Sequence, residues 1–343
     1  MGLLRQGVVM TKSFNVAVVG ATGTVGETLV QVLEEREFPV ANLHLLAGSA
    51  SSGQSVAFRG KNLRVRELAG FDFSQVQLVF FAAGESVSRE HAPRAQAAGC
   101  SLIDLSGVLD GALPVVPEAN ADVLATLSAP YLLCSPAPVA TALAAVLAPL
   151  RATLQMHKVT VLAALAVSQF GREGVAELAR QTTELLNMRP LEPQLFDRQI
   201  AFNVLAQAGV VGESGHALLE QRIARELKVL LGIEGLKVAV SCCLAPVFFG
   251  DSLAVTVDTG CTVDLKQVAG VLDQQAGLEL VEAGDYPSVV GDAVSQDELY
   301  VGRLRGGMDD PAELNLWIAS DNARKGSALN AVQIGELLIK HYL

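Results

Sequence analysis

Phe14-Asn-Val-Ala-Val-Val-Gly20-Ala-Thr-Gly23-Thr-Val-Gly26 is the stretch that predicts the fold most clearly. Its first half is a β-branched, nearly continuous apolar run, as found in buried parallel strands. The glycine-rich second half leads into a helical pattern through Leu29, Val32 and Leu33. Glycines let the backbone approach a pyrophosphate, and the free N–H groups of the helix start supply donors and a partial positive charge. Strand, glycine loop and helix in this order predict a dinucleotide-binding unit.

The candidate cofactor-binding residues in this loop are Gly20, Thr22, Gly23, Thr24 and Val25. The glycine spacing is Gly-x-x-Gly-x-x-Gly rather than the commoner Gly-x-Gly-x-x-Gly. A glycine-rich turn between a strand and a helix also serves packing without any ligand. Nucleotide binding is therefore a prediction, and a purely structural turn is its alternative.

The segment Leu45-Leu-Ala-Gly-Ser49-Ala-Ser51-Ser-Gly53 bears on the choice between NAD and NADP. An NAD-binding unit is expected to carry an acidic residue about 20 residues beyond the glycine loop. This segment contains none, whereas Ser49 and Ser51 are able to donate hydrogen bonds to a phosphate. We keep both NAD and NADP open as cofactors.

Strand-like and helical patterns continue to alternate along the chain. Apolar runs predict buried strands at 76–82, 101–104 and 131–134, and turn-forming residues predict loops at 83–86 and 113–120. Helical patterns end near Ala98 and run again from Ala140 to Leu150. Such alternation is typical of an α/β, doubly wound parallel sheet of the Rossmann-like type. Further strand patterns, at 158–163, 236–244 and 253–257, indicate a second, α+β domain.

Composition limits the possible partners. The 343 residues are 50% hydrophobic and 18% charged, with a net charge of -11 and a pI near 5.0. No dense Lys/Arg stripe offsets this negative field, which disfavours nucleic acid and anionic membranes as partners. We find no apolar run of the roughly 18 residues that a membrane span needs. The five cysteines form no CxxC pair and the five histidines are dispersed, so no metal site is visible.

The start of the chain lacks the pattern of a secretory signal peptide. Met10 is an alternative start, because the first predicted strand begins a few residues later. We expect a cytoplasmic protein with buried, reduced thiols.

Several segments, taken in order, resemble the aspartate-β-semialdehyde dehydrogenase family. Those segments are Phe81-Ala-Ala-Gly-Glu-Ser-Val-Ser-Arg89, Pro114-Val-Val-Pro-Glu-Ala-Asn120, Gln199-Ile-Ala-Phe-Asn203, Val301-Gly-Arg-Leu-Arg305 and Ser320-Asp-Asn-Ala-Arg-Lys-Gly326-Ser-Ala-Leu-Asn330-Ala-Val-Gln333. The resemblance implies a homodimer of two-domain subunits. Residues 1–134 would form the dinucleotide-binding domain, completed by a C-terminal helix over 322–343, and residues 135–321 the catalytic-like, dimerisation domain.

The same resemblance points to cofactor residues. Asn322 aligns with a residue near the family's nicotinamide. Ala50 stands where the family has an arginine that holds the 2′-phosphate of NADP, which weakens the expectation of NADP without removing it.

The chain departs from the family at its catalytic and substrate positions. The nucleophile loop Asn-Pro-Asn-Cys-Ser-Thr is matched by Cys134-Ser-Pro-Ala-Pro138-Val-Ala-Thr141, so the cysteine position falls at Pro138. The family's glutamine, arginine and general-base histidine align with Leu165, Leu244 and Asp251, and its phosphate-binding arginine aligns with Asp110.

Proline offers neither a nucleophile nor a backbone N–H, so it excludes thioester formation at position 138. Cys134 lies four residues earlier, about 13 Å away in an extended chain, and does not replace it. We interpret Asp251 as a solvated or hydrogen-bonded loop residue and Asp110 as a structural residue. Leu165 and Leu244 are interpreted as apolar filling of a former polar site. An aspartate in place of arginine would repel phosphate.

The pattern is most like the catalytically depleted, Usg-type paralogues within the family. The first hypothesis is therefore a homodimer that is inactive as a semialdehyde dehydrogenase and acts by binding a small molecule or a protein. The second hypothesis is an NAD(P)-dependent oxidoreductase that transfers hydride without a covalent intermediate to a different substrate.

Overall fold

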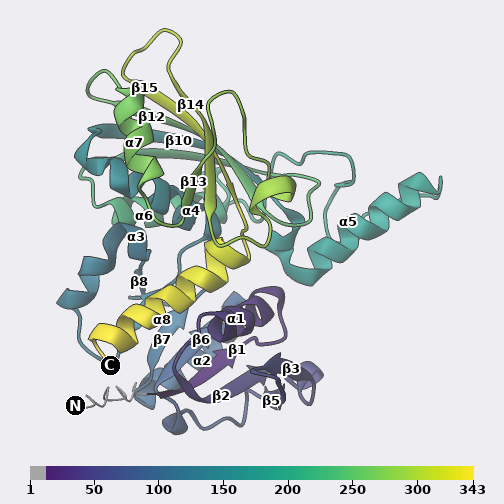
Figure 1. The fold of residues 1–343 in the computed structure, drawn as a ribbon. Coiled ribbons are helices and arrows are strands. Elements are labelled where there is room, and N and C mark those ends of the chain that lie inside the picture. Colours follow the sequence, from purple (N-terminus) through teal and green to yellow (C-terminus); the bar gives the residue numbers. More distant parts are fainter. Residues whose placement is uncertain (1–12) are drawn as a thin grey trace, which may run out of the picture.

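The computed structural model describes residues 13–343, and its two large sheets have a long helix between them (Figure 1). The candidate start Met10 lies outside the described residues. No helix within 13–343 has the length and apolar character needed to cross a bilayer.

The first sheet has seven strands, all paired in parallel, as the alternating pattern predicts. Its order is β5 (Arg66–Glu67), β2 (Val40–Ala47), β1 (Phe14–Val19), β6 (Leu78–Phe81), β7 (Ser101–Asp104), β9 (Leu132–Cys134) and β8 (Leu113–Pro114).

Alternate residues of β1 pack on opposite faces of this sheet. Val16 and Val18 contact the apolar stripes of α1 (Thr24–Glu35) and α8 (Asn330–His341). Ala17 and Val19 share a core with Ala92 and Ala95 of α2 (Glu85–Ala97). Helices therefore cover both faces, which confirms the doubly wound, Rossmann-like prediction.

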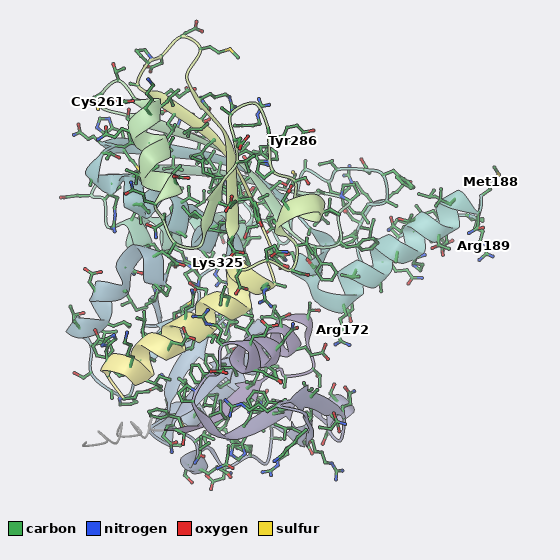
Figure 2. All side chains as sticks on the ribbon, viewed as in Figure 1. Arg172, Met188, Arg189, Cys261, Tyr286 and Lys325 are labelled. Carbon is green, nitrogen blue, oxygen red and sulfur yellow. The ribbon has the colours of Figure 1, made fainter. Side chains whose placement is uncertain are left out.

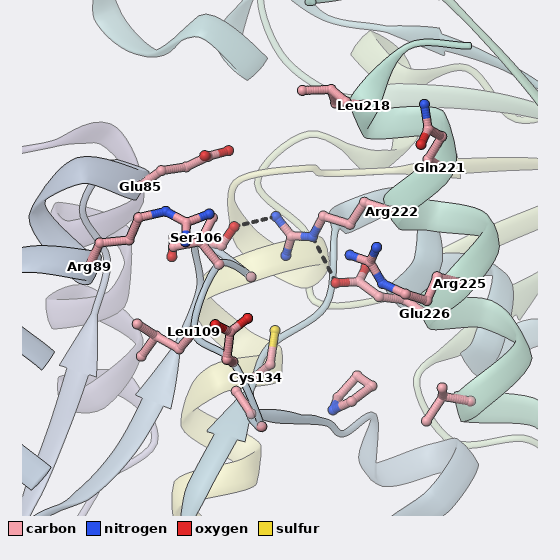
Figure 3. Close-up of a pocket in the computed structure, with 17 residues that line it drawn as sticks. Glu85, Arg89, Ser106, Leu109, Cys134, Leu218, Gln221, Arg222, Arg225 and Glu226 are labelled. Carbon is pink, nitrogen blue, oxygen red and sulfur yellow. Dashed lines mark hydrogen bonds and ion pairs between the residues drawn. The ribbon is translucent and has the colours of Figure 1, made fainter. Parts of the chain in front are cut away.

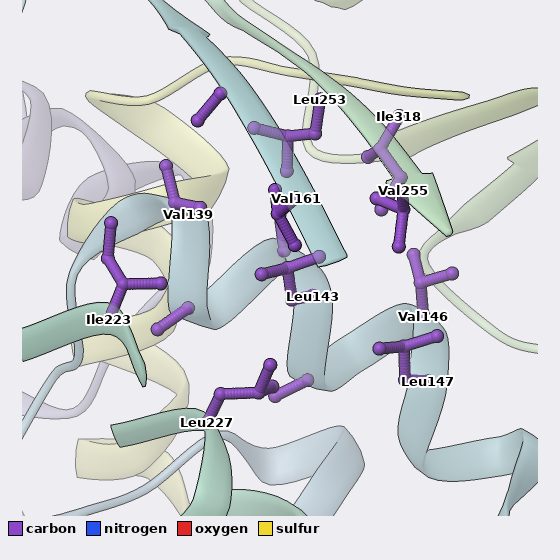
Figure 4. Packing of buried hydrophobic residues seen from close by; sticks show 14 of the residues in the cluster. Val139, Leu143, Val146, Leu147, Val161, Ile223, Leu227, Leu253, Val255 and Ile318 are labelled. Atoms are coloured by element: carbon purple, nitrogen blue, oxygen red, sulfur yellow. The ribbon is translucent and has the colours of Figure 1, made fainter. Parts of the chain in front are cut away.

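The second sheet is mixed and has six strands. Its order is β11 (Lys237–Leu244), β10 (Met156–Leu165), β12 (Asp251–Thr259), β15 (Glu313–Ser320), β14 (Leu299–Gly306) and β13 (Leu278–Leu280). One face packs against α4 (Pro138–Leu147), α6 (Leu218–Leu231) and α7 (Leu265–Asp273). Figure 4 shows Leu143, Val146 and Leu147 of α4 directed at residues of β10, β12 and β15. This arrangement confirms a second, α+β domain.

The opposite face of the second sheet is partly exposed to solvent. Leu162, at the middle of β10, is 52% exposed between Ser241 of β11 and Ala254 of β12. Helix α5 (Gly171–Leu186) projects away from the body of the subunit, and Met188 lies at its far end (Figures 1 and 2).

The C-terminal segment returns to the first domain. After β15 the chain forms a π-helical segment, η7 (Arg324–Leu329), and α8, whose Val332, Ile334 and Leu338 join the core of the first sheet. The predicted boundary at 134/135 falls between β9 and α4, and it stays a prediction of domain limits.

Two local expectations need correction. The loop expected at 83–86 already contains the start of α2, and the loop expected at 113–120 contains β8 and the short helix α3 (Pro117–Asn120). The thiols are also less uniformly buried than expected, because Cys261 is exposed and Cys243 is half-buried. A separate two-stranded hairpin consists of β3 (Ser55–Phe58) and β4 (Lys61–Arg64).

Candidate functional site

Two of the three loop glycines are required by the packing of the chain itself. Gly20 has φ +83°, and a Cβ there would lie 2.4 Å from the carbonyl oxygen of Ala82. A Cβ on Gly26 would lie 2.0 Å from the carbonyl oxygen of Gly20. Neither contact is possible, so Gly20 and Gly26 serve strand and helix packing whether or not a ligand binds.

Gly23 is different, because packing does not explain it. A Cβ on Gly23 would meet only the Gly20 carbonyl oxygen, at 3.4 Å, and its backbone is extended with φ −79° and ψ 164°. Gly23 is the N-cap of α1, and within residues 13–343 the N–H groups of Thr24 and Val25 have no acceptor. Half-buried Thr22 adjoins them. This end of α1 is a surface at which a phosphate would find backbone donors.

The Ser49 segment lies at the carboxyl end of β2, next to the carboxyl end of β1. It forms a short turn, η1 (Ser49–Ser51), in which Ser49 and Ala50 are exposed and Ser51 is half-buried. The two predicted cofactor segments therefore lie on adjacent strands of one sheet edge, where ligands of open α/β sheets bind.

Asn322 is buried in a network that links three segments of the second domain. Its Oδ1 accepts a hydrogen bond from the backbone N–H of Gly250 at 2.9 Å, and its side chain contacts the Ser168 hydroxyl at 3.1–3.2 Å. A cavity between Thr24 and the neighbouring Asp321 and Ala323 connects this segment with the start of α1. Asn322 therefore lies near the glycine loop, with its own side chain already engaged.

Pro138 is the first residue of α4, directly after the loop that follows β9. Proline suits this position, since the first turn of a helix needs no N–H donor and its φ is preset. The Cβ of Pro138 would be 2.6 Å from a Cβ added to Gly326, so the ring packs closely on η7. The backbone N–H of the preceding Ala137 donates to Oε2 of Glu226 at 2.8 Å.

Leu165 and Leu244 are brought together by the sheet. They are Cα partners at the ends of the parallel strands β10 and β11, and they are 0% and 1% exposed. Both belong to the same apolar core as Ala137 and Val139. Hydrocarbon therefore occupies the interior beside the start of α4.

Asp251 opens β12 on the other side of β10 from β11, and therefore adjoins Leu165. Its Oδ1 accepts from the backbone N–H of Ala166 at 3.0 Å, and its Oδ2 is buried without a hydrogen-bond partner within residues 13–343. Burial, opposed by the Ala166 hydrogen bond and helped by Asp321, raises the pKa of Asp251 to about 7. The loop position expected from the sequence is thus a buried strand end with a carboxyl group that is partly protonated at neutral pH.

Asp110 lines a separate pocket of about 520 Å³ between the first domain and α6 (Figure 3). Arg222 extends from α6 into it, donating from Nη1 to the Ser106 carbonyl at 2.5 Å and from Nε to Oε1 of Glu226 at 2.7 Å. A Cβ on Gly107, whose φ is +72°, would overlap the Arg222 guanidinium at 2.1–2.5 Å. Nη2 of Arg222 is buried with no partner in the part of the chain that the structure describes.

The charge of this pocket is mixed. Arg89 and Arg225 also line it, as do Glu85 and Glu226, so Asp110 does not make it uniformly repulsive to anions. The sequence reasoning missed Arg222 and Glu226. Their i, i+4 spacing was visible, and Glu226 interrupts the apolar helical positions Ile223, Leu227 and Leu230.

Cys134 lies beside Arg222 in the same pocket and is the thiol nearest in sequence to Pro138. Burial raises the pKa of the Cys134 thiol, and the negative charge of Glu226 raises it further. A thiol in this environment stays protonated and is a poor nucleophile. Within residues 13–343, no group of three or more His, Cys, Asp or Glu side chains is arranged to hold a metal ion.

Two family models match the chain. The semialdehyde dehydrogenase NAD binding domain matches residues 15–127, and the semialdehyde dehydrogenase dimerisation domain matches residues 147–325.

The chain is also similar to individual proteins over nearly its whole length. It is 59% identical to the USG-1 protein homolog of Pseudomonas aeruginosa, over 97% of this chain and 100% of that protein. It is 39% identical to aspartate-semialdehyde dehydrogenase 2 of Vibrio cholerae, with the same coverage.

Solved structures agree with these similarities. The structure of a probable aspartate-semialdehyde dehydrogenase from Pseudomonas aeruginosa superposes with a TM-score of 0.95 at 59% identity, covering 97% of this chain and 100% of that chain. Aspartate semialdehyde dehydrogenase II of Vibrio cholerae, complexed with ASA, superposes with a TM-score of 0.94 at 38% identity and the same coverage.

Proposed function

Since the chain belongs to the aspartate-semialdehyde dehydrogenase family, we propose that it is a homodimer that has lost the family's covalent chemistry and acts by binding. Its ligand is a nicotinamide nucleotide, another small molecule or a protein partner. We expect no phosphate-dependent oxidation of aspartate semialdehyde, and we expect a cytoplasmic location.

The observation that carries the proposal is the proline at the start of α4. A thioacyl intermediate needs a thiolate at this point, and the pyrrolidine ring of Pro138 has none. The surroundings offer no substitute, because Leu165 and Leu244 are buried hydrocarbon and Cys134 is a buried thiol with a raised pKa. We therefore propose that Pro138, Leu165, Leu244, Asp251 and Asp110 occupy the family's former catalytic and substrate positions.

Nucleotide binding is supported by the NAD binding domain match and by Gly23. The unpaired amides of Thr24 and Val25, and the open space above Gly23, fit a pyrophosphate at the start of α1. When bound, a nicotinamide nucleotide would supply a hydride acceptor or donor. The residues that would hold it are Gly20, Thr22–Val25, Ser49, Ser51 and the segment around Asn322.

The homodimer is supported by the dimerisation domain match and by the exposed apolar groups of the second domain. Leu162 on the open sheet face, and Leu186 and Met188 at the end of α5, are 52%, 71% and 96% exposed. Apolar side chains in these places are typical of a subunit interface.

A second candidate function is hydride transfer without a covalent intermediate. The observation that favours it is Asp251, a carboxyl group whose pKa of about 7 suits proton transfer at neutral pH. Its substrate would be a less anionic carbonyl compound, because the groups buried near Asp251 include the hydrocarbon side chain of Leu165.

The two functions are separated by titration calorimetry followed by an activity screen. We expect the purified protein to bind NADP, NAD or their reduced forms in the micromolar range, and to show no reduction of NADP with aspartate semialdehyde and phosphate. Absence of binding at millimolar nucleotide would remove both the nucleotide role and the second candidate. Oxidation of NADPH by a neutral aldehyde or ketone would favour the second candidate over the first.

A further inference from the structure

We infer that Arg172, a residue of the second domain, strengthens dinucleotide binding by neutralising Glu27 at the phosphate-binding end of α1. This inference rests on the proposed nucleotide binding and adds a residue from the other domain to that site. Arg172 acts through Glu27 and does not itself contact the phosphate, so it is a positioning residue.

Glu27 is the acidic residue in the first turn of α1. Its backbone N–H donates to the carbonyl of the N-cap residue Gly23 at 2.9 Å, so its carboxylate follows directly after the amides proposed for the pyrophosphate. Thr24 and Glu27 are three residues apart on the helix, and both line one cavity of about 510 Å³. A carboxylate in this turn is attracted to the positive end of the helix and competes there with a phosphate.

Arg172 brings the opposite charge to this end of α1. Its Nη2 lies 2.6 Å from Oε2 of Glu27, and both residues line the cavity between α1 and α5. Figure 2 shows Arg172 at the base of α5 and Arg189 just beyond its far end. The side chains of Arg172 and Glu27 are 62% and 47% exposed, so their ion pair is expected to contribute little to the stability of the fold.

The start of α5 is held in place by close backbone packing. Gly171 has φ +64°, and a Cβ added to Gly174 would lie 2.1 Å from the carbonyl oxygen of Val167. The first turn of α5 therefore lies directly against the segment that follows β10. Because this packing sets the position of the backbone at Arg172, the guanidinium is presented to Glu27 across the cavity.

The physical effect is electrostatic and acts on the pyrophosphate. A single charge at a solvent-exposed helix end changes the affinity for an anion by several-fold, and added salt screens the change. The pyrophosphate is common to NADP and NAD. We therefore expect Arg172 to affect the binding of both nucleotides equally.

A double-mutant cycle measured by calorimetry at low salt, on the full-length protein with NADP and NAD, tests the inference. Arg172→Gln should weaken the binding of both nucleotides by about threefold to tenfold, because Glu27 is then a free negative charge. Glu27→Gln should strengthen binding. The double variant Glu27→Gln with Arg172→Gln should bind within about twofold of the wild type, since it has lost both charges together.

Two variants control for the change in net charge. Arg189→Gln removes an exposed positive charge beyond the far end of α5, and Glu34→Gln removes an exposed negative charge from the last turns of α1. Neither should change the affinity for either nucleotide. In 1 M NaCl, where the Debye length is about 3 Å, the difference between Arg172→Gln and the wild type should shrink.

The outcomes separate this inference from the function on which it rests. A double variant as weak as Arg172→Gln would mean that Arg172 contacts the phosphate or only holds α1 in place, and it would overturn the neutralising role. Unchanged affinity in Arg172→Gln, or an effect on NADP alone, would overturn it too. Each of these results leaves nucleotide binding intact, whereas no binding of either nucleotide by the wild type would overturn both.

Discussion

At position 138 a single side chain determines which chemistry is available. Pro138 is structurally favourable in the first turn of α4, where no N–H donor is needed. Its side chain has no nucleophilic atom. The paired leucines at 165 and 244 add buried hydrocarbon to the apolar core beside the start of α4. We therefore propose that several residues together remove the family's covalent activity, and we expect that restoring one of them will not restore turnover.

The variant Pro138→Cys tests this point. A thiol at the start of α4 should have a lowered pKa, so intact mass spectrometry after alkylation at neutral pH should show one more modified cysteine per chain than the wild type. NADP reduction with aspartate semialdehyde and phosphate should remain undetectable. Pro138→Ala is the control without a thiol. Turnover in Pro138→Cys would show that the rest of the site is still competent.

Asp251 makes stability depend on pH. Its pKa is raised from 3.8 in the unfolded chain to about 7 in the native protein, so between these values the native state holds a proton that the unfolded state releases. The stabilising contribution is complete below pH 4 and is lost as pH rises toward 7, by about 4 kcal/mol in total.

Asp251→Asn keeps the hydrogen-bond acceptor for Ala166 and removes the ionisation. Relative to the wild type, we expect its free energy of unfolding to increase between pH 4 and pH 8 by up to about 4 kcal/mol. Urea unfolding of both proteins across this range measures the difference. A difference between the two proteins that does not change with pH would mean that Asp251 does not titrate in this window.

At the scale of elements, the glycine loop combines a structural requirement with a ligand surface. Gly20 and Gly26 are fixed by contacts with Ala82 and with the loop itself, whereas the surface above Gly23 is open. The sequence alone did not separate these roles, because all three glycines have the same spacing in either interpretation.

Alanine substitutions distinguish a glycine required for packing from a glycine at the ligand surface. Gly23→Ala should change the free energy of unfolding by no more than about 0.5 kcal/mol, because its backbone angles suit any residue. If a pyrophosphate binds here, the same variant should lose about tenfold or more in nucleotide affinity. Gly20→Ala should instead destabilise the protein by about 2 kcal/mol or more. Full nucleotide affinity in Gly23→Ala would favour the purely structural turn.

Much of the architecture was predictable from local patterns. The strand at 101–104 has the predicted limits. Apolar runs in the sequence also coincide with six further strands, namely β1, β6, β9, β10, β11 and β12. What the sequence did not show depends on contacts between distant residues. The packing of Arg222 on Gly107 joins two segments that are far apart in the chain, and so does the burial of Asp251 against Ala166.

At the scale of the whole molecule, the open face of the second sheet is expected to be covered by a second subunit. Leu162 lies at the centre of that face, with the small residues Ser241 and Ala254 on either side. Burial of such a face would remove apolar area from water and leave the nucleotide-binding edge of the first domain accessible.

Leu162→Asp should therefore shift the protein from dimer to monomer. Light scattering coupled to size-exclusion chromatography should give the wild type twice the 36.0 kDa mass of the chain and the variant a value near one chain mass. Met308→Asp, at a fully exposed turn between β14 and β15, is the control and should remain dimeric. A dimeric Leu162→Asp would place the interface elsewhere.

We propose that the fold keeps a nucleotide site and has lost the thioester chemistry of the family. A single-turnover experiment tests both parts: the protein, in excess over NADP, is mixed with aspartate semialdehyde and phosphate, and NADPH is followed by absorbance. We predict no burst and no slow formation of NADPH, in the same preparation that binds nucleotide by calorimetry. Stoichiometric or continuing formation of NADPH would contradict the conclusion drawn from Pro138.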